Sequence, residues 1–238
     1  MSGDILFLAH RIPYPPDRGD KIRSWHILKH LAGLARVHLA CFADDEADAA
    51  HLPALPRELG SALGETHVEV RKVGKFAAAA RAMPAGQAIS LAMFESLGLR
   101  AFVKDVLARQ PVATIYAFSG QMAQFVPQPC HVRFLMDFVD MDSAKFGDYA
   151  AGARGPMRWL HRREAERLFA FERATAARAD ASIFVSAAEA DLFRREAALP
   201  RAEIRAIGNG IDLNFYDPRA DIEPLAAQQG PLIVFTGR

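Results

Sequence analysis

The sequence has only two cysteines, no excess of either charge and no long apolar run. Cys41 and Cys130 are far apart and outside any Cys-x-x-Cys pair, which excludes a disulfide framework and indicates the thiols of a reducing compartment. No apolar stretch reaches the roughly 20 residues that cross a bilayer. Residues 1–4 enter an apolar strand at once, without the basic start and cleavage site of a secretory signal. We therefore expect a cytoplasmic protein.

The charge balance and two missing motifs exclude several partners. The chain has 29 Lys and Arg against 28 Asp and Glu, so no global field favours nucleic acid, and we expect no nucleic-acid partner. A Gly-x-Gly-x-x-Gly loop is missing, which leaves a nicotinamide dinucleotide poorly supported. Gly74-Lys75 lacks the earlier glycine and the following Ser or Thr of a Walker loop. No cofactor is expected.

Short strand-like runs alternate with helical patterns. Residues 4–9 are almost continuously apolar, as in a strand buried on both faces of a parallel sheet, and the next apolar spacing predicts a helix from about Asp20 to Gly33. Further strands are predicted at 37–42, 67–73, 112–117, 132–136, 181–185 and 203–207, and helices at 75–83, 88–109, 156–178 and 187–195. The alternating 67–73 strand belongs nearer the sheet edge. This order predicts a doubly wound α/β fold with a mainly parallel, Rossmann-like sheet.

The periodicity stops near residue 213. Pro218, Pro224 and Gly230 interrupt it, and an apolar run then begins again. We predict a first domain at 1–212, a linker at 213–230 and the first strand of a second domain at 231–238. The apolar residues 232–235 belong inside a sheet, so they are also a candidate for self-association.

The loop after the first strand is the first candidate site. Ligands of open α/β sheets bind beyond the carboxyl ends of the strands, often at the first strand–helix turn. Gly19 would let a phosphate approach the amides of a helix start, and Arg18 and Lys21 could add positive charge. The alternative is an ordinary proline-stiffened loop with solvated cations.

The segment after the fifth strand is the second candidate. Asp137, Asp140 and Asp142 are costly to crowd together unless they meet a cation, a sugar hydroxyl or basic partners. No His or Cys accompanies them at ligand spacing, so a metal is not expected. The alternative is capping of the next helix, for which Asp and Ser are well suited.

A predicted turn near the end of the chain is informative because of the residues that precede and follow it. Gly208-Asn209-Gly210 alone is only a sharp turn. It is preceded by Ile183-Phe184-Val185-Ser186 and followed by Asp212, Phe215, Pro218 and Ile233-Val234-Phe235-Thr236-Gly237-Arg238. This succession over 181–238 resembles the family 4 retaining glycosyltransferases. The first loop and the 137–143 segment are similar to sugar transferases of the exopolysaccharide and exosortase-associated group.

The resemblance implies a two-domain GT-B enzyme that carries a sugar from a nucleotide-diphosphate-sugar to a glycan or lipid-linked acceptor, in exopolysaccharide or cell-surface polysaccharide synthesis. It implies no metal, and the nucleotide-sugar is a co-substrate. The donor phosphates would face Arg18, Gly19 and Lys21. The acceptor would lie near His10, Tyr116, Ser119, Asp137 and Asp140, of which Ser119 and Asp137 are the catalytic candidates. The cleft and hinge would include Gly208, Asn209, Gly210 and Asp212.

Two departures from the family pattern bear on catalysis. The Glu-x7-Glu pair of the second domain lies in a region that this sequence does not contain, so we expect the 238 residues alone to be inactive. Many relatives place a histidine after the fourth strand, where this sequence has Ser119. The alternatives are a GT-B sugar-nucleotide epimerase, or a non-catalytic domain that binds a sugar-phosphate or a protein.

The predicted helix at 156–178 carries more arginine than glutamate, together with Trp159, Leu160 and Phe169. A basic amphipathic helix can lie on anionic lipid, which would place the protein at the inner face of the membrane and suit a lipid-linked acceptor. The favoured alternative is a core-packing helix with a solvated polar face.

Overall fold

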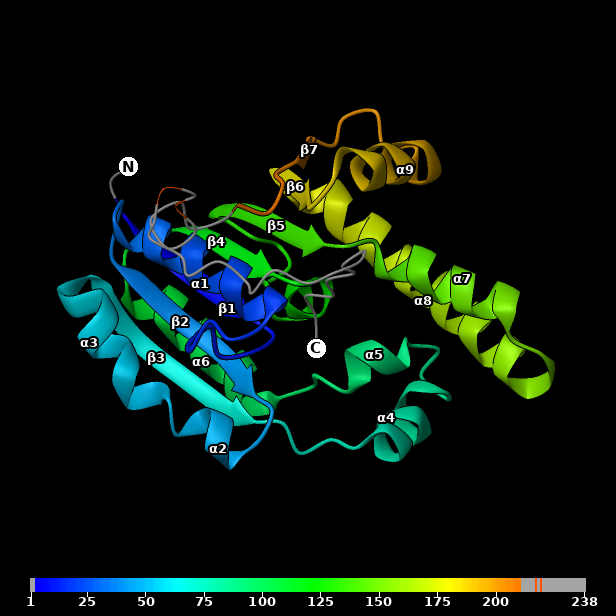
Figure 1. The fold of residues 1–238 in the computed structure, drawn as a ribbon, viewed down its shortest axis with the longest axis horizontal. Helices are drawn as coiled ribbons and strands as arrows, with labels where there is room; N and C mark the ends of the chain where they lie inside the picture. Colours follow the sequence, from blue (N-terminus) through cyan, green and yellow to red (C-terminus); the bar gives the residue numbers. More distant parts are fainter. Residues whose placement is uncertain (1–2, 211–216, 218, 220–238) are drawn as a thin grey trace, which may run out of the picture.

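A seven-stranded parallel sheet forms the centre of the molecule. The computed structural model describes residues 3–210, 217 and 219. Within them the strand order is β3-β2-β1-β4-β5-β6-β7, and every neighbouring pair is parallel. The strands are β1 Asp4–Ala9, β2 Val37–Ala43, β3 Leu63–Val70, β4 Val112–Phe118, β5 Arg133–Val139, β6 Ala181–Phe184 and β7 Ile204–Ala206. The predicted doubly wound α/β fold is confirmed, and the alternating strand β3 lies at an edge (Figure 1).

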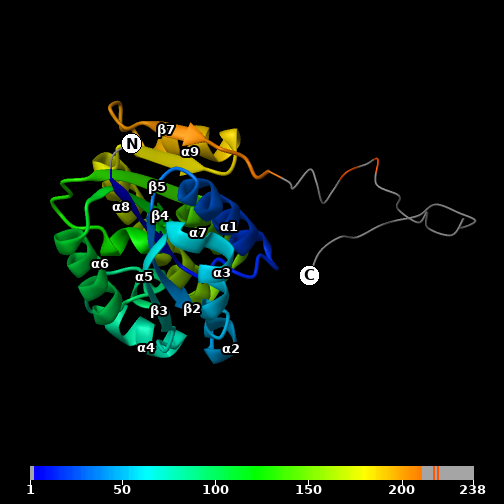
Figure 2. The ribbon, with the colours of Figure 1, turned by 90° about the vertical axis from the view of Figure 1, so that its left-hand side faces the viewer.

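Helices cover both faces of this sheet. They are α1 Gly19–Ala32, α2 Glu46–Ala49, α3 Leu55–Leu59, α4 Lys75–Ala82, α5 Ile89–Ala92, α6 Leu97–Arg109, α7 Asp142–Gly152, α8 Gly155–Arg178 and α9 Ala187–Ala197, with a 3-10 turn at Gly120–Phe125. In β1, Phe7 packs with Trp25 of α1 on one face, whereas Leu8 packs with Val103 of α6 on the other. The sheet therefore runs between α1 and α6, as Figure 2 shows, which explains why β1 is apolar at successive positions.

The strand order reverses at β1, and this positions the site. β1 pairs with β2 on one side and with β4 on the other, so the connections that leave these strands diverge to opposite sides. The divergence leaves a crevice at the carboxyl ends of β1 and β4, which is where open α/β sheets bind ligands.

Two predicted elements differ from the observed ones, and the described residues contain helices that were not predicted. The helix predicted at 88–109 is two helices, α5 and α6, because the Ser96 hydroxyl caps α6 by accepting a hydrogen bond from the Leu99 amide at 2.9 Å. The strand predicted at 67–73 lies at 63–70, where β2 supplies its pairing partners. The predicted set lacks α3 and α7. α7 forms an antiparallel hairpin with α8 that projects from the sheet (Figure 1).

The predictions about the end of the chain lie outside the described residues. They concern Asp212, the linker at 213–230, the strand at 231–238 and self-association through 232–235. Among the helices that the structure describes, none combines the length and the apolarity needed to cross a bilayer.

Candidate functional site

A cavity of about 570 Å³ opens at the crevice between β1 and β4. His10 lines it from the end of β1, Phe118 and Ser119 from the end of β4, and Val139 and Asp140 from the end of β5. We call it the switch-point pocket. Three strand ends meet there because parallel strands point their carboxyl ends to the same edge.

His10 is held in the wall of this pocket by aromatic rings. Its ring lies 5.8 Å from that of Phe118 and 6.3 Å from that of Phe94, between centroids. His10 Nε2 lies 3.2 Å from a carboxylate oxygen of Asp20. Burial lowers the pKa of His10 although Asp20 opposes the change, so the imidazole is neutral at pH 7. Among the described residues, the buried Nδ1 of His10 has no hydrogen-bond partner.

Three arginines and two aspartates form a network at the pocket's rim. Arg11 donates to Asp20 at 2.7 Å and to Asp44 at 2.9 Å. Asp44 also accepts from Arg18 at 2.7 Å and from Arg71 at 3.0 Å. Burial alone would raise the pKa of Asp44, but the arginines outweigh it and hold that pKa below its usual value. Both carboxylates are thus charged at pH 7, and the guanidinium groups are fixed in place around them.

Two strand ends at the pocket have an unusual backbone. Ser119 has φ 75° and Val139 has φ 69°, and positive φ is an outlier for a β-branched residue such as valine. The Ser119 hydroxyl donates to the amide oxygen of Gln121, whose amide nitrogen donates to Asp142 at 3.0 Å. Strained backbone of this kind clusters at functional sites, and here it supports the choice of pocket.

Asp137 and Tyr116 do not line the switch-point pocket. Asp137 has no exposed surface, and one carboxylate oxygen accepts from Arg23 at 3.0 Å and from the Tyr116 hydroxyl at 2.9 Å. Its other oxygen accepts from the Val139 amide at 3.0 Å, which holds the positive-φ turn. Burial raises the pKa of Asp137, with Arg23 opposing the change. The contacts of this carboxylate are thus made within the fold.

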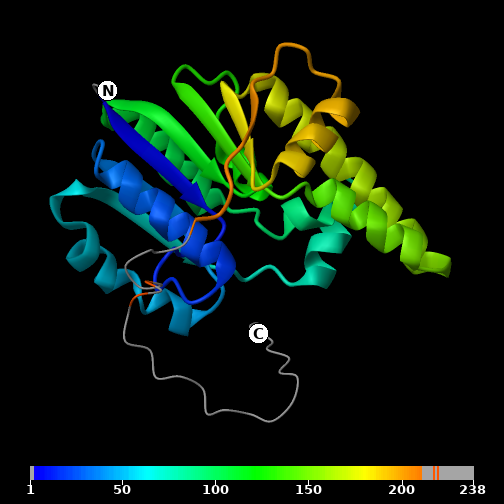
Figure 3. The same cartoon turned by 45° about the horizontal axis from the view of Figure 1, so that its top comes forward.

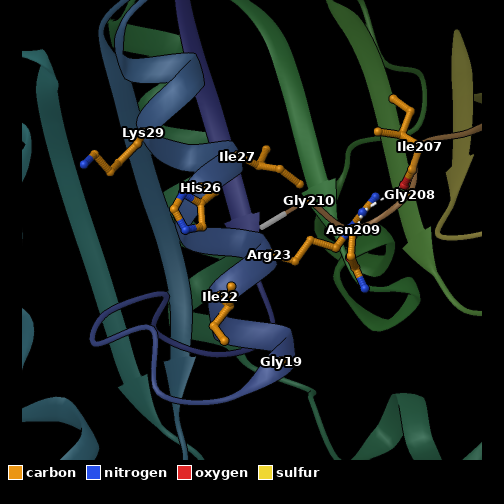
Figure 4. A pocket seen from close by; sticks show the side chains of 10 residues that line it. All are labelled: Gly19, Ile22, Arg23, His26, Ile27, Lys29, Ile207, Gly208, Asn209 and Gly210. Atoms are coloured by element: carbon orange, nitrogen blue, oxygen red, sulfur yellow. Dashed lines mark hydrogen bonds between the residues drawn. The ribbon is translucent and has the colours of Figure 1, made fainter. Parts of the chain in front are cut away.

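A second groove of about 760 Å³ lies between α1 and the segment after β7 (Figure 4). Gly19 borders it at the start of α1, and Gly208, Asn209 and Gly210 border it on the opposite side. This segment crosses the sheet toward α1 (Figure 3), and the Arg23 guanidinium holds it by donating to Ile207 O at 2.9 Å. A second bond, to Asn209 Oδ1 at 3.1 Å, completes the clamp.

The three residues predicted to face the donor phosphates differ in their surroundings. Among the described residues, a Cβ added to Gly19 would meet no heavy atom within 4 Å, so they leave the space beside the α1 N-terminus open. The side chain of Arg18 is 40% exposed at the rim of the pocket. Lys21 is buried, and its ammonium group binds Asp48. The structure therefore leaves Gly19 and Arg18 accessible and uses Lys21 to join α1 to α2.

Sequence reasoning missed Arg11, Asp44 and Arg71 as members of the site. Asp44 directly follows β2, and Arg71 directly follows β3. Their position after strand ends at the ligand-binding edge was the available signal, but an acidic residue there also fits a helix start.

Almost half of the chain matches a known protein family. Residues 105–215 match the family model described as Glycosyltransferase Family 4. The match includes β4 and β5, which supply two walls of the switch-point pocket, and the segment Gly208–Gly210. A comparison with curated protein sequences gives no match.

Two solved structures share the fold. The sucrose-phosphate synthase of Thermosynechococcus elongatus is 16% identical with a TM-score of 0.57, and the match covers 92% of this chain and 51% of that one. Anabaena HepE in complex with UDP and glucose is 19% identical with a TM-score of 0.52, over 90% of this chain and 46% of that one. The chain thus spans about half the length of each.

Proposed function

We propose that this chain is the acceptor-side lobe of a two-lobed GT-B glycosyltransferase, which moves a sugar from a nucleotide-sugar to a hydroxyl of a glycan or lipid-linked acceptor. The observation that carries the proposal is the switch-point pocket beside the open N-terminus of α1, inside a fold shared with longer chains. The match to the family 4 model over 105–215 supports sugar transfer. The UDP and glucose held by HepE support a nucleotide-sugar donor.

The donor diphosphate would lie at the start of α1. The N-cap residue Arg18 makes no side-chain cap, so the first amides and the positive end of the helix dipole favour an anion there. Gly19 has neither a left-handed φ nor a close neighbour that would require glycine. A phosphate that approaches the backbone gives a reason for the missing side chain. Together with Arg18, the helix would balance the charge of the leaving diphosphate without a metal.

The acceptor would occupy the switch-point pocket. His10 offers a neutral imidazole, and Ser119 and Asp140 offer oxygen atoms that can bind sugar hydroxyls. In this proposal the groups that grip the nucleotide belong to a second lobe, which closes over the pocket and completes the site. We also propose that the transfer retains the anomeric configuration of the sugar and serves cell-surface polysaccharide synthesis, because the sequence resembles the family 4 retaining glycosyltransferases.

Substitution at Gly19 tests the donor site. In a protein that contains both lobes, Gly19→Val places a branched side chain where the diphosphate would lie. We expect the KM for the nucleotide-sugar to rise at least about tenfold, which corresponds to ~1.4 kcal/mol of lost binding, with an unchanged melting temperature. Gly74→Val is the matched control, because Gly74 also stands at a helix start and a Cβ added there would meet no heavy atom of the described residues within 4 Å. An unchanged donor KM in Gly19→Val would rule out the phosphate position.

Product analysis separates transfer from the alternatives. We expect release of nucleoside diphosphate with a glycosylated acceptor, whereas an epimerase would change the donor sugar without an acceptor. The 238 residues alone should not turn over the donor, because one lobe cannot grip both substrate and transition state. Turnover by these residues at a rate close to that of the two-lobed protein would contradict the proposal.

A further inference from the structure

Two segments far apart in sequence expose large apolar side chains. The segment 71–83, which contains α4, exposes 94% of Phe76 and also part of Met83. The segment 149–163, at the turn of the α7–α8 hairpin, exposes 56% of Trp159 and 51% of Met157, and about half of Tyr149. Isolated exposed apolar residues are ordinary, but this concentration on two short segments marks an interaction surface.

The same two segments carry only positive charge. They contain eight of the chain's 29 Lys and Arg and none of its 28 Asp and Glu, although the whole chain is balanced. The exposed cations are Lys72, Lys75, Arg81, Arg154, Arg158 and Arg162. Of these, Arg162 pairs with Glu166, and the other five have no carboxylate within 4.0 Å among the described residues. The surface is therefore basic as well as apolar.

Contacts from α8 hold the two segments together. The Arg163 guanidinium donates to Ala82 O at 3.2 Å and to Gln87 O at 3.0 Å, at the end of α4. The Glu164 carboxylate accepts from the amides of Ile89 at 2.8 Å and Ser90 at 2.7 Å, at the start of α5. As Figure 1 shows, α4 and α5 lie beside the projecting hairpin at one end of the molecule.

We propose that the segments 71–83 and 149–163 form one surface that docks on an anionic lipid bilayer. Arginine and lysine side chains attract acidic headgroups, while Phe76, Met157 and Trp159 suit the boundary between headgroups and acyl chains. A second copy of the chain fits less well, because copies meeting through this face would bring like charges together. The surface is independent of the proposed sugar transfer, since its test needs neither donor nor acceptor.

The position of the surface suits an acceptor that is itself anchored in the bilayer. Ser90 and Met93, from the region of α5, line the switch-point pocket, and so does Lys145 of α7. These elements are continuous with the segments that carry the exposed side chains. Docking would therefore bring the pocket close to the headgroups.

Vesicle flotation tests the proposal. We expect the protein to float with phosphatidylcholine vesicles that contain about 30% phosphatidylglycerol, to stay unbound with phosphatidylcholine alone, and to dissociate at high salt. Arg81→Gln/Arg158→Gln should weaken partitioning roughly thirtyfold, since each cation near an anionic surface is worth about a factor of five. Phe76→Ser/Trp159→Ser should also abolish flotation. The controls are Arg57→Gln/Lys104→Gln and Leu97→Ser, which change exposed residues on other elements.

The results of these experiments either support or overturn docking on lipid. Flotation lost in both surface variants and kept in both controls supports docking on lipid. The proposal is overturned by absence of binding to the anionic vesicles, or by equal losses in surface and control variants. It is also overturned if sedimentation without lipid shows a dimer that Phe76→Ser/Trp159→Ser dissociates, because the surface would then join two copies.

Discussion

Two buried carboxylates illustrate how different surroundings give an acidic residue different properties. Asp137 lies opposite the Arg23 guanidinium and accepts hydrogen bonds from Tyr116 and a backbone amide. Glu172 of α8, also buried, accepts from the amide of Ser143 at 3.0 Å and from its hydroxyl, and among the described residues it has no ion pair with a cation. Burial therefore raises the pKa of Glu172 from an ordinary value of 4.5 to about 7.

The raised pKa makes stability depend on pH. Between 4.5 and about 7 the folded protein holds a proton on Glu172 that the unfolded chain has released. The contribution of this group to the free energy of unfolding is thus full at pH values below 4.5, and it is lost as pH rises through about 7. Glu172→Gln mimics the protonated form, so we expect it to gain up to about 3 kcal/mol relative to the wild type between about pH 4.5 and pH 8.

Chemical denaturation of both proteins at the two pH values measures this difference. Glu166→Gln serves as the control, because Glu166 lies on the same helix with a side chain that is 64% exposed. The stability of the control relative to the wild type should change little with pH. A Glu172→Gln difference that is equal at both pH values would contradict the assigned pKa.

At the scale of elements, local patterns placed most strands and helices within a few residues of their observed bounds, and they failed at two boundaries. The continuous apolar run of β1 was enough to place it, because burial on both faces leaves little else to fit. The boundary between α5 and α6 depends on the Ser96 cap, and the start of β3 depends on Val37 pairing with Leu63. The hydrogen bond from Arg23 to Asp137 joins residues 114 positions apart, and no local sequence pattern indicates that contact.

The position of α5 depends on a cap supplied by another helix. Glu164 accepts hydrogen bonds from the Ile89 amide at 2.8 Å, the Ser90 amide at 2.7 Å and the Ser90 hydroxyl at 2.7 Å. Glu164→Ala leaves these buried donors without an acceptor, at a cost of about 1.5–3 kcal/mol for a charged hydrogen-bond group. We expect amide hydrogen exchange over 89–92 to accelerate roughly tenfold or more, with β1 and β4 unchanged.

Hydrogen exchange followed by mass spectrometry resolves this segment. Glu166→Ala is the matched control, since it removes an exposed glutamate two positions along the same helix. Faster exchange spread equally over the central strands would indicate global destabilisation and would contradict a local role for Glu164.

At the scale of the whole molecule, one sheet connects two separate cores. Leu8 lies in the core between the sheet and the helices α6, α8 and α9. Trp25 of α1 lies in the core on the other face, to which α3 also contributes. Both cores contain side chains of β1. Unfolding of either core therefore removes packing contacts of this strand. The two faces should therefore unfold as a single cooperative unit.

The two tryptophans provide a test of this cooperativity. Trp25 is only 4% exposed and reports on the α1 face, and Trp159→Phe removes the second, exposed reporter. In that background we expect Leu8→Ala to cost about 2–5 kcal/mol, as for other large-to-small core substitutions. The transitions followed by Trp25 emission and by circular dichroism should shift together, even though Leu8 lies on the opposite face.

An early transition in circular dichroism with an unmoved Trp25 transition would instead mean that the two layers unfold separately. Met157→Ala, at an exposed site on the hairpin, controls for an effect of shortening any apolar side chain.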